Sequence, residues 1–114
     1  MTKVECIVKA MDDKLAQDIV AINMENASPL YDTFILCTAS NKRLLNAIQD
    51  NVVDQCEMNG FEIKSREARG NPEWILIDAG DGICHIFSEE ARKEYNLEKL
   101  WSDMPTIDIK EYLA

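Results

Sequence analysis

Two aspartates that flank a glycine-containing segment are the strongest candidates for chemistry in this sequence. Asp78 and Asp81 stand on either side of Ala79-Gly80, and Asp32 comes just before another apolar run. Carboxylates at strand ends are able to hold Mg²⁺ for phosphoryl transfer. Aspartate and glycine also form tight turns, where the Asp side chain accepts hydrogen bonds from nearby backbone amides. We favour this turn role for Asp78 and Asp81.

The remaining side chains form no arrangement typical of an active site. His85 is the single histidine and is adjacent to Cys84. Neighbours in a strand point to opposite faces, so these two cannot form a catalytic dyad. Ser40 has no histidine near it in the sequence, and neither Gly-x-x-x-x-Gly-Lys-Ser/Thr nor Gly-x-Gly-x-x-Gly occurs. The sequence therefore predicts a protein that is not an enzyme and that needs no cofactor or metal.

The four cysteines are widely spaced and form no Cys-x-x-Cys pair. A zinc site built from them would need ligands gathered from distant positions. A disulfide framework is arithmetically possible, but no feature of the sequence indicates secretion. We expect four buried thiols in a reducing cytosol: Cys6, Cys37, Cys56 and Cys84.

Three amphipathic helices are predicted from hydrophobic periodicity and capping residues. A capping-box pattern over Thr2–Glu5 opens the first helix. Ser40 is the expected N-cap of the second helix, which ends at Asn59-Gly60. Ser88 is the expected N-cap of the third helix, with two acidic residues in its first turn.

Five apolar segments bounded by turn residues predict the strands. They cover residues 18–24, 31–37, 61–66, 74–78 and 83–87. The last two are joined by a glycine-rich connection typical of a hairpin, whereas the second and third flank a helix and favour parallel pairing. The sequence thus predicts a mixed α/β fold, with a sheet of about five strands layered against about three helices.

The composition indicates a single acidic domain. The chain has 114 residues, with 12 basic and 21 acidic side chains and a net charge of −9. This charge disfavours binding to nucleic acid or to an anionic membrane, and it favours a basic protein surface as partner. No apolar run approaches the roughly 20 residues of a membrane-spanning helix, and no signal peptide is evident. We expect one domain over residues 1–114, located in the cytoplasm.

Aromatic side chains near acidic residues are the best candidates for a binding surface. Trp74, Leu76 and Asp78 share one face of their predicted strand. Tyr95 and Trp101 lie in a segment rich in charged residues. Such a combination is typical of interface hot spots with a charged rim, but large aromatics are also highly buried on average. The pattern alone leaves both an interface role and a core role open.

Five segments with distinctive residue combinations follow one another along the chain. They are Tyr31-Asp32-Thr33-Phe34-Ile35, Thr38-Ala39-Ser40-Asn41-Lys42, Trp74-Ile75-Leu76-Ile77-Asp78-Ala79-Gly80-Asp81, His85-Ile86-Phe87 and Glu90-Ala91-Arg92-Lys93-Glu94-Tyr95-Asn96-Leu97-Glu98-Lys99-Leu100-Trp101. In this order and spacing they resemble the Iojap family of ribosomal silencing factors, RsfS. The resemblance covers about residues 15–101 and leaves a tail at residues 102–114.

The resemblance implies a small mixed-sheet domain that is related in fold to nucleotidyltransferases but lacks their catalytic residues. It also implies binding to the large ribosomal subunit through ribosomal protein uL14, at a face that otherwise contacts the small subunit. Subunit association would then be blocked and translation repressed when nutrients are limiting. The family's partner-binding surface corresponds to Trp74, Ala79 and Tyr95, with Asp78, Asp81 and Glu98 as charged neighbours.

Two alternatives remain open beside this expectation. A metal-dependent nucleotidyltransferase-like enzyme would use Asp78 and Asp81 to hold its metal ion. A self-associating module would pair two copies as a homodimer through the aromatic patch, as members of the family are able to do.

The sequence departs from the family pattern at two positions of the turn beside the expected contact. Gly82 and Ala79 are smaller than the residues that the family usually has there.

Overall fold

The computed structural model describes residues 1–68 and 70–114, which form a mixed α/β domain of the predicted class. Its elements are α1 (Lys3–Asp13), β1 (Gln17–Asn23), β2 (Thr33–Ala39), α2 (Lys42–Met58), β3 (Ser65–Ala68), β4 (Trp74–Asp78), β5 (Gly82–Ser88), α3 (Glu89–Tyr95), α4 (Leu97–Leu100), β6 (Thr106–Ile107) and the 3₁₀ helix η1 (Lys110–Tyr112). The expectation of about three helices is confirmed by α1, α2 and α3, to which α4 adds one short turn.

The sheet has six strands in the order β3-β4-β5-β2-β1-β6. Among the described residues β2 and β5 form its parallel pair, and the other neighbouring strands run antiparallel. The prediction of five strands is wrong by one, because Thr106–Ile107 in the C-terminal tail pairs with β1. A two-residue strand is too short for the sequence to show an alternating pattern.

The third predicted strand, residues 61–66, differs from the structure in place and in partner. β3 begins only at Ser65 and pairs antiparallel with β4, so the expected parallel pairing with the strand at 31–37 is wrong. Phe61 and Ile63 alternate with polar residues because they pack against the core from an extended segment before the strand. The parallel partner of β2 is β5, which arrives only after the β3–β4 pair is complete.

Local capping fixes where the helices start and end. Thr2 and Ser88 are the N-caps of α1 and α3, as predicted. For α2 the N-cap is Asn41 and not Ser40: the Asn41 side chain accepts the backbone N–H three residues ahead at 2.8 Å. Serine and asparagine cap helices equally well, so two adjacent candidates leave the sequence undecided by one residue. Gly60, with φ at 81°, follows α2 where the sequence predicts its end.

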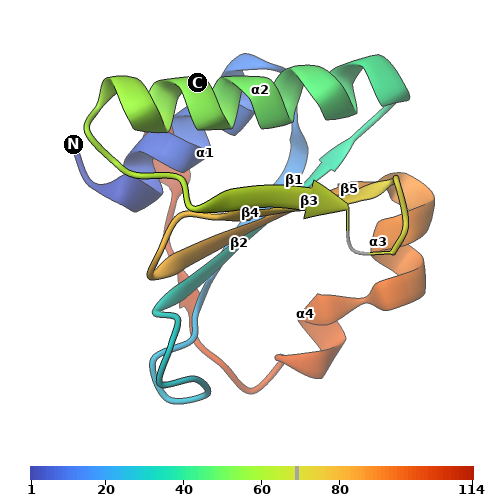
Figure 1. Cartoon of the computed structure of the whole chain (residues 1–114). Coiled ribbons are helices and arrows are strands. Elements are labelled where there is room, and N and C mark those ends of the chain that lie inside the picture. Colours follow the sequence, from blue (N-terminus) through green and yellow to red (C-terminus); the bar gives the residue numbers. More distant parts are fainter. Residues whose placement is uncertain (69) are drawn as a thin grey trace.

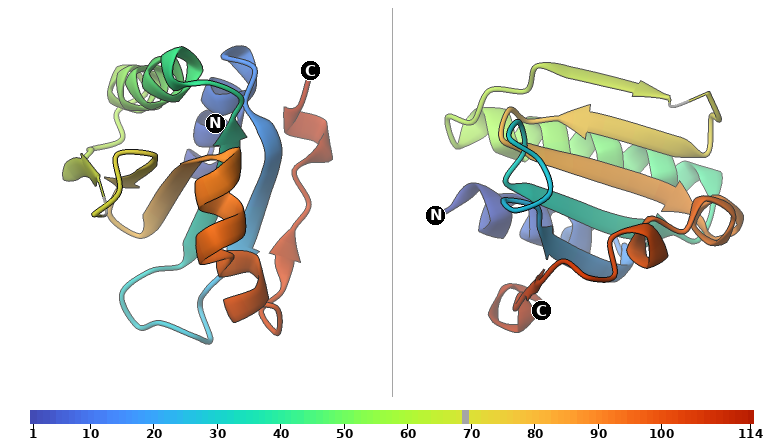
Figure 2. Two further views of the ribbon diagram at one scale, coloured as in Figure 1. Left: turned by 90° about the vertical axis from the view of Figure 1, so that its right-hand side faces the viewer. Right: turned by 90° about the horizontal axis from the view of Figure 1, so that it is seen from below.

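The helices cover the two faces of the sheet unequally (Figure 1). α1 and α2 lie together across one face, and the main core fills the space between them and the strands. Side chains there with no exposed surface include Ile7, Met11, Ile48, Val52, Ile77 and Ile86. On the other face α3 lies against β2 and β5 and reaches β4 through the Tyr95 ring, which leaves most of β3 and β4 without a covering helix (Figure 2). None of the helices in residues 1–68 and 70–114 is long and apolar enough to cross a membrane.

Candidate functional site: an aromatic groove on the open sheet face

The uncovered face of the sheet carries a shallow groove with a volume of about 380 Å³. Successive side chains of a strand point to opposite faces, so alternate residues of β2, β3, β4 and β5 form its floor while α4 forms one wall. The lining includes Phe34, Trp74, Leu76, His85, Leu100 and Trp101. The expectation that Trp74, Leu76 and Asp78 share one face of their strand is confirmed, since all three line this groove.

Aromatic rings make the groove a continuous surface. Tyr95 lies at one end, with its ring centroid 4.4 Å from that of Trp74, and it is 37% exposed. The Trp74 indole stacks on Phe87 at 5.3 Å with an interplanar angle of 27°. At the other side Trp101 meets Phe34 edge to face at 6.4 Å. Trp74 is therefore half-buried, supported from below by a core ring and accessible from the groove.

His85 is the polar centre of this aromatic surface. Its side chain is only 4% exposed, and its Nδ1 accepts a hydrogen bond from the Trp74 indole N–H at 3.1 Å. The Phe34 ring stands against the imidazole at 4.8 Å in an edge-to-face arrangement. The imidazole is therefore held in place by its neighbours. Cys84 points into the core on the other side of the sheet, as expected for its strand neighbour.

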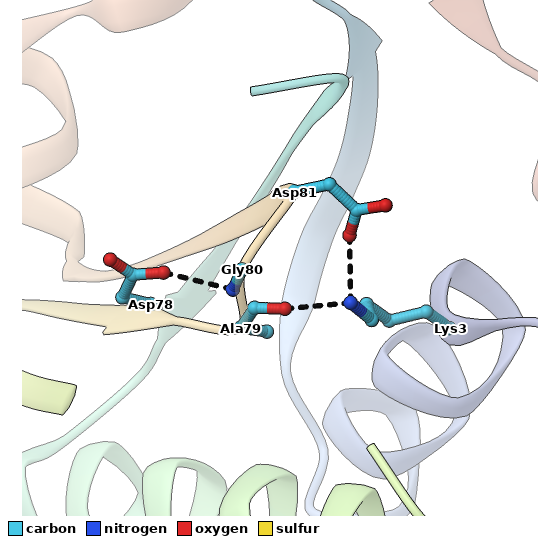
Figure 3. A network of polar contacts seen from close by, with 5 residues as sticks. All are labelled: Lys3, Asp78, Ala79, Gly80 and Asp81. Carbon is cyan, nitrogen blue, oxygen red and sulfur yellow. Dashed lines mark hydrogen bonds and ion pairs between the residues drawn. The ribbon is translucent and has the colours of Figure 1, made fainter. Parts of the chain in front are cut away.

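The two aspartates of the β4–β5 turn are engaged separately (Figure 3). Asp78 Oδ1 accepts the Gly80 backbone N–H at 2.9 Å, which is the turn role that the sequence favours. Lys3 Nζ donates to Asp81 Oδ1 and to the Ala79 carbonyl oxygen, both at 2.7 Å. The hydrogen bond from Lys3 lowers the pKa of Asp81 below its usual 3.8. The two carboxylates lie on opposite sides of the turn, so they do not converge on one metal ion.

Within the two described stretches of the chain, no three His, Cys, Asp or Glu side chains are placed to share a metal ion. Cys6, Cys37, Cys56 and Cys84 are free and buried, as predicted. Burial raises the pKa of all four thiols, to about 12 for Cys37 and Cys56. Such thiols behave as small apolar side chains and are poor nucleophiles.

The structure brings only part of the predicted partner-binding set together. Trp74, Tyr95 and Asp78 lie on or beside the groove. Ala79 is 1% exposed and packs in the main core, so its side chain is not accessible to a partner. Asp81 faces α1 from the far side of the turn, where it pairs with Lys3.

Glu98 has a partner within the chain. Its Oε1 accepts from Arg92 Nε at 2.8 Å, while Arg92 Nη1 donates to Thr38 Oγ1 at 2.9 Å. The Arg92 side chain is only 11% exposed, and these contacts tie α3 to α4 and to β2. Glu98 therefore helps to hold α4, the wall of the groove, and it lines a separate hollow.

Several groove residues lie outside the set that the sequence suggested, among them Phe34, His85 and Leu100. A signal for Phe34 exists in the alternation of its strand, but the strand order is needed to place it beside β5. Leu100 is 64% exposed and follows Leu97 at helical spacing, so an exposed apolar stripe on α4 was the available signal.

Comparisons with known proteins agree with this architecture. The family model "Ribosomal silencing factor during starvation" matches residues 1–114. The "Ribosomal silencing factor RsfS" of Bacillus subtilis (strain 168) is 40% identical over 100 residues, covering 88% of this chain and 85% of that protein. A crystal structure of a Bacillus halodurans protein has a TM-score of 0.79 and 37% identity, covering 92% of this chain and 95% of that one.

A more distant relative comes from an animal. The mouse protein "Mitochondrial assembly of ribosomal large subunit protein 1" is 25% identical over 105 residues, which cover 87% of this chain and 45% of the mouse protein. The resemblance noted in the sequence, the full-length family match and the similar fold all point the same way. The chain belongs to the ribosomal silencing factor (RsfS) family.

Proposed function

We propose that the protein binds the large ribosomal subunit through ribosomal protein uL14 and blocks association with the small subunit. Translation is thereby repressed when nutrients are limiting. The observation that supports this most strongly is the open aromatic groove beside Trp74 and Tyr95. The groove belongs to an acidic protein of a ribosomal silencing factor family. The mouse relative's name, which refers to the large ribosomal subunit, supports the choice of subunit.

The groove has the features of a small hot-spot surface. Trp74 and Tyr95 supply large rings that are already supported by neighbours, so little side-chain freedom is lost on binding. Leu100 adds an exposed apolar side chain at the wall. Asp78 lies at the end of β4, on the rim of the same surface. These residues are the proposed contacts, and Ala79, Asp81 and Glu98 support the surface through the turn and α4.

Charge directs the protein to a protein patch and away from RNA. The net charge of −9 repels ribosomal RNA and attracts a basic ribosomal protein. Contact is therefore confined to uL14. This activity takes place in the cytoplasm of a bacterial cell, where the subunits meet.

The block needs no catalysis. The molecule measures 35 × 33 × 27 Å, so a copy bound at the joining face occupies space that the small subunit needs in order to associate. We infer that it acts as an obstacle without turnover. The enzymatic alternative would require Asp78 and Asp81 to share a metal ion, and their separate engagement in the turn does not favour it.

Replacing the two anchoring rings tests this proposal. We expect Trp74→Ala and Tyr95→Ala each to weaken binding to purified large subunits by about 2 kcal/mol, or about 30-fold, because hot-spot rings supply most of the affinity. Binding is measured by co-sedimentation, and the block by light scattering during subunit association. Met58→Ala is the matched control, since Met58 is 78% exposed on α2, across the sheet from the groove.

Two outcomes would contradict the proposal. One is wild-type affinity for both folded ring variants; the other is unimpaired subunit association at saturating wild-type protein.

Sedimentation of the protein alone and with uL14 tests homodimer formation through the same groove. Under the proposal, uL14 and a second copy compete for this surface, so added uL14 dissociates any dimer.

A further inference from the structure

The Trp74 indole is held by one side-chain hydrogen bond, from its N–H to His85 Nδ1 at 3.1 Å. The register explains why this contact forms. Trp74 pairs with Phe87 and Leu76 pairs with His85, so His85 occupies the diagonal position on the neighbouring strand and the same face. Diagonal neighbours are within reach of aromatic side chains. The acceptor therefore comes from the rigid centre of the sheet.

His85 is itself firmly held. Besides the Phe34 edge at 4.8 Å, the Phe87 ring lies nearly parallel to the imidazole, at 6.1 Å and 11°. With 4% of its surface exposed, the ring has little room to turn. Because Nδ1 accepts, it carries no proton, and the neutral imidazole has its proton on Nε2. The lone pair on Nδ1 of the fixed His85 ring therefore points to the Trp74 indole N–H.

Stacking alone leaves the orientation of Trp74 less defined. The indole contacts Phe87 at 5.3 Å and Tyr95 at 4.4 Å, and both contacts tolerate sliding or a flipped ring. The torsion that turns the ring has broad minima. The hydrogen bond to His85 selects one of these orientations, because a flipped ring would leave a half-buried N–H without this acceptor.

We propose that His85 is a positioning residue for partner binding: through Nδ1 it fixes the Trp74 indole, and with it the Tyr95 contact, in the binding orientation before the partner arrives. This inference rests on the proposed function and extends it to a residue at the floor of the groove that is only 4% exposed. Preorganising a hot-spot ring strengthens binding because the ordering cost is met during folding.

Nuclear magnetic resonance tests the hydrogen bond without any partner. The chain has two tryptophans, so a ¹⁵N-labelled sample gives two indole N–H signals, and Trp101→Phe assigns them. We expect the Trp74 signal to lie downfield and to exchange slowly with solvent, and His85→Phe to remove both properties. An unshifted, fast-exchanging Trp74 signal in the wild type would overturn the inference.

A double-mutant cycle tests the positioning role in binding. The second change replaces Trp74 by benzothienylalanine, which keeps the ring shape but has sulfur in place of the N–H. Each single change should weaken binding to purified large subunits by about fivefold to tenfold, the value of one neutral hydrogen bond. The two together should cost no more than one alone, since both remove the same contact.

The outcomes separate this inference from the proposed function. If His85→Phe binds large subunits as tightly as the wild type does, the positioning role is overturned and the proposed function still stands. Additive losses assign His85 a merely structural role and also overturn it. Absence of wild-type binding overturns both. If His85→Phe does not fold, the benzothienylalanine variant tests the inference alone, because it removes only the N–H donor of position 74. The inference then requires this variant to bind large subunits about fivefold to tenfold more weakly than the wild type, and unchanged binding overturns it.

Discussion

The two faces of the sheet are built by different means. Under α1 and α2, aliphatic side chains and thiols pack with almost no exposed surface. On the other face, aromatic rings lie half-buried in ring-to-ring contacts, and polar contacts of His85 and Arg92 hold the elements in place. The comparison thus divides the sheet into a covered face that is entirely core and an open face that combines a smaller buried cluster, including Leu36 and Phe87, with an uncovered apolar groove.

Strand β4 contains both halves of this division. Ile75 and Ile77 are 8% and 0% exposed beneath the helices, whereas Trp74 and Leu76 are half-buried in the groove. Because side chains alternate along a strand, adjacent residues of one short element contribute to different functions. Matched substitutions at neighbouring positions can therefore measure the division directly.

The largest expected effect is the loss of a large aliphatic side chain from the covered face. Ile77→Ala should lower the free energy of unfolding by about 2–5 kcal/mol, because it removes buried contacts and leaves a cavity. Leu76→Ala, one residue away on the open face, should cost about 1 kcal/mol and instead weaken binding to large subunits. Urea denaturation and co-sedimentation of the two variants provide the measurements. Equal losses of stability would show that the groove is ordinary core and would break the comparison.

An intermediate effect is expected where polar contacts replace packing. Arg92→Ala removes the hydrogen bonds to Thr38 and Glu98 that join α3, α4 and β2, and should lower the free energy of unfolding by about 1–2 kcal/mol. Because Leu100 lies on α4 and Trp101 directly follows it, binding to the large subunit should weaken as well. Lys93→Ala, an exposed position on the same helix, is the control for urea denaturation. If Arg92→Ala matched this control, α4 would be held by packing alone.

Local features of the fold are predictable from the sequence because their causes are local. The caps at Thr2 and Ser88 and the hairpin at residues 79–82 follow from residues that lie close together. The sixth strand and the pairing of β2 with β5 do not, because they depend on contacts between distant segments. Register between such segments is decided by the whole sheet and not by any one pattern.

The groove residues likewise divide into those with local causes and those that depend on distant segments. Alternation along β4 places Trp74 and Asp78 on one face, and the structure agrees. Nothing near Ala79 in the sequence shows that its side chain is buried beneath the turn, and nothing near Glu98 identifies Arg92 as its partner across six positions. The importance of His85 also depends on a cross-strand neighbour. The type of a side chain indicates which contacts it is able to make, whereas the residues that it contacts depend on the order and register of the strands.

The smallest expected effect concerns the contact that joins α1 to the turn between the two halves of the hairpin. Lys3 lowers the pKa of Asp81 below its usual 3.8, so the ionised carboxylate stabilises the folded protein above that pH. The Asp81 side chain is 59% exposed and that of Lys3 26%, so solvent screening limits the contribution of the pair to about 0.5 kcal/mol.

Asp81→Asn should therefore cost about 0.5 kcal/mol near neutral pH, as measured by urea denaturation of both proteins. The difference should disappear as the pH falls below 3.8 and through the folded-state pKa, because the wild-type carboxylate then becomes neutral too. Binding to the large subunit should change little, since Asp81 faces α1 and not the groove. A strong loss of binding would instead extend the contact surface around the turn, and the boundary between the two faces would have to be drawn beyond Asp81.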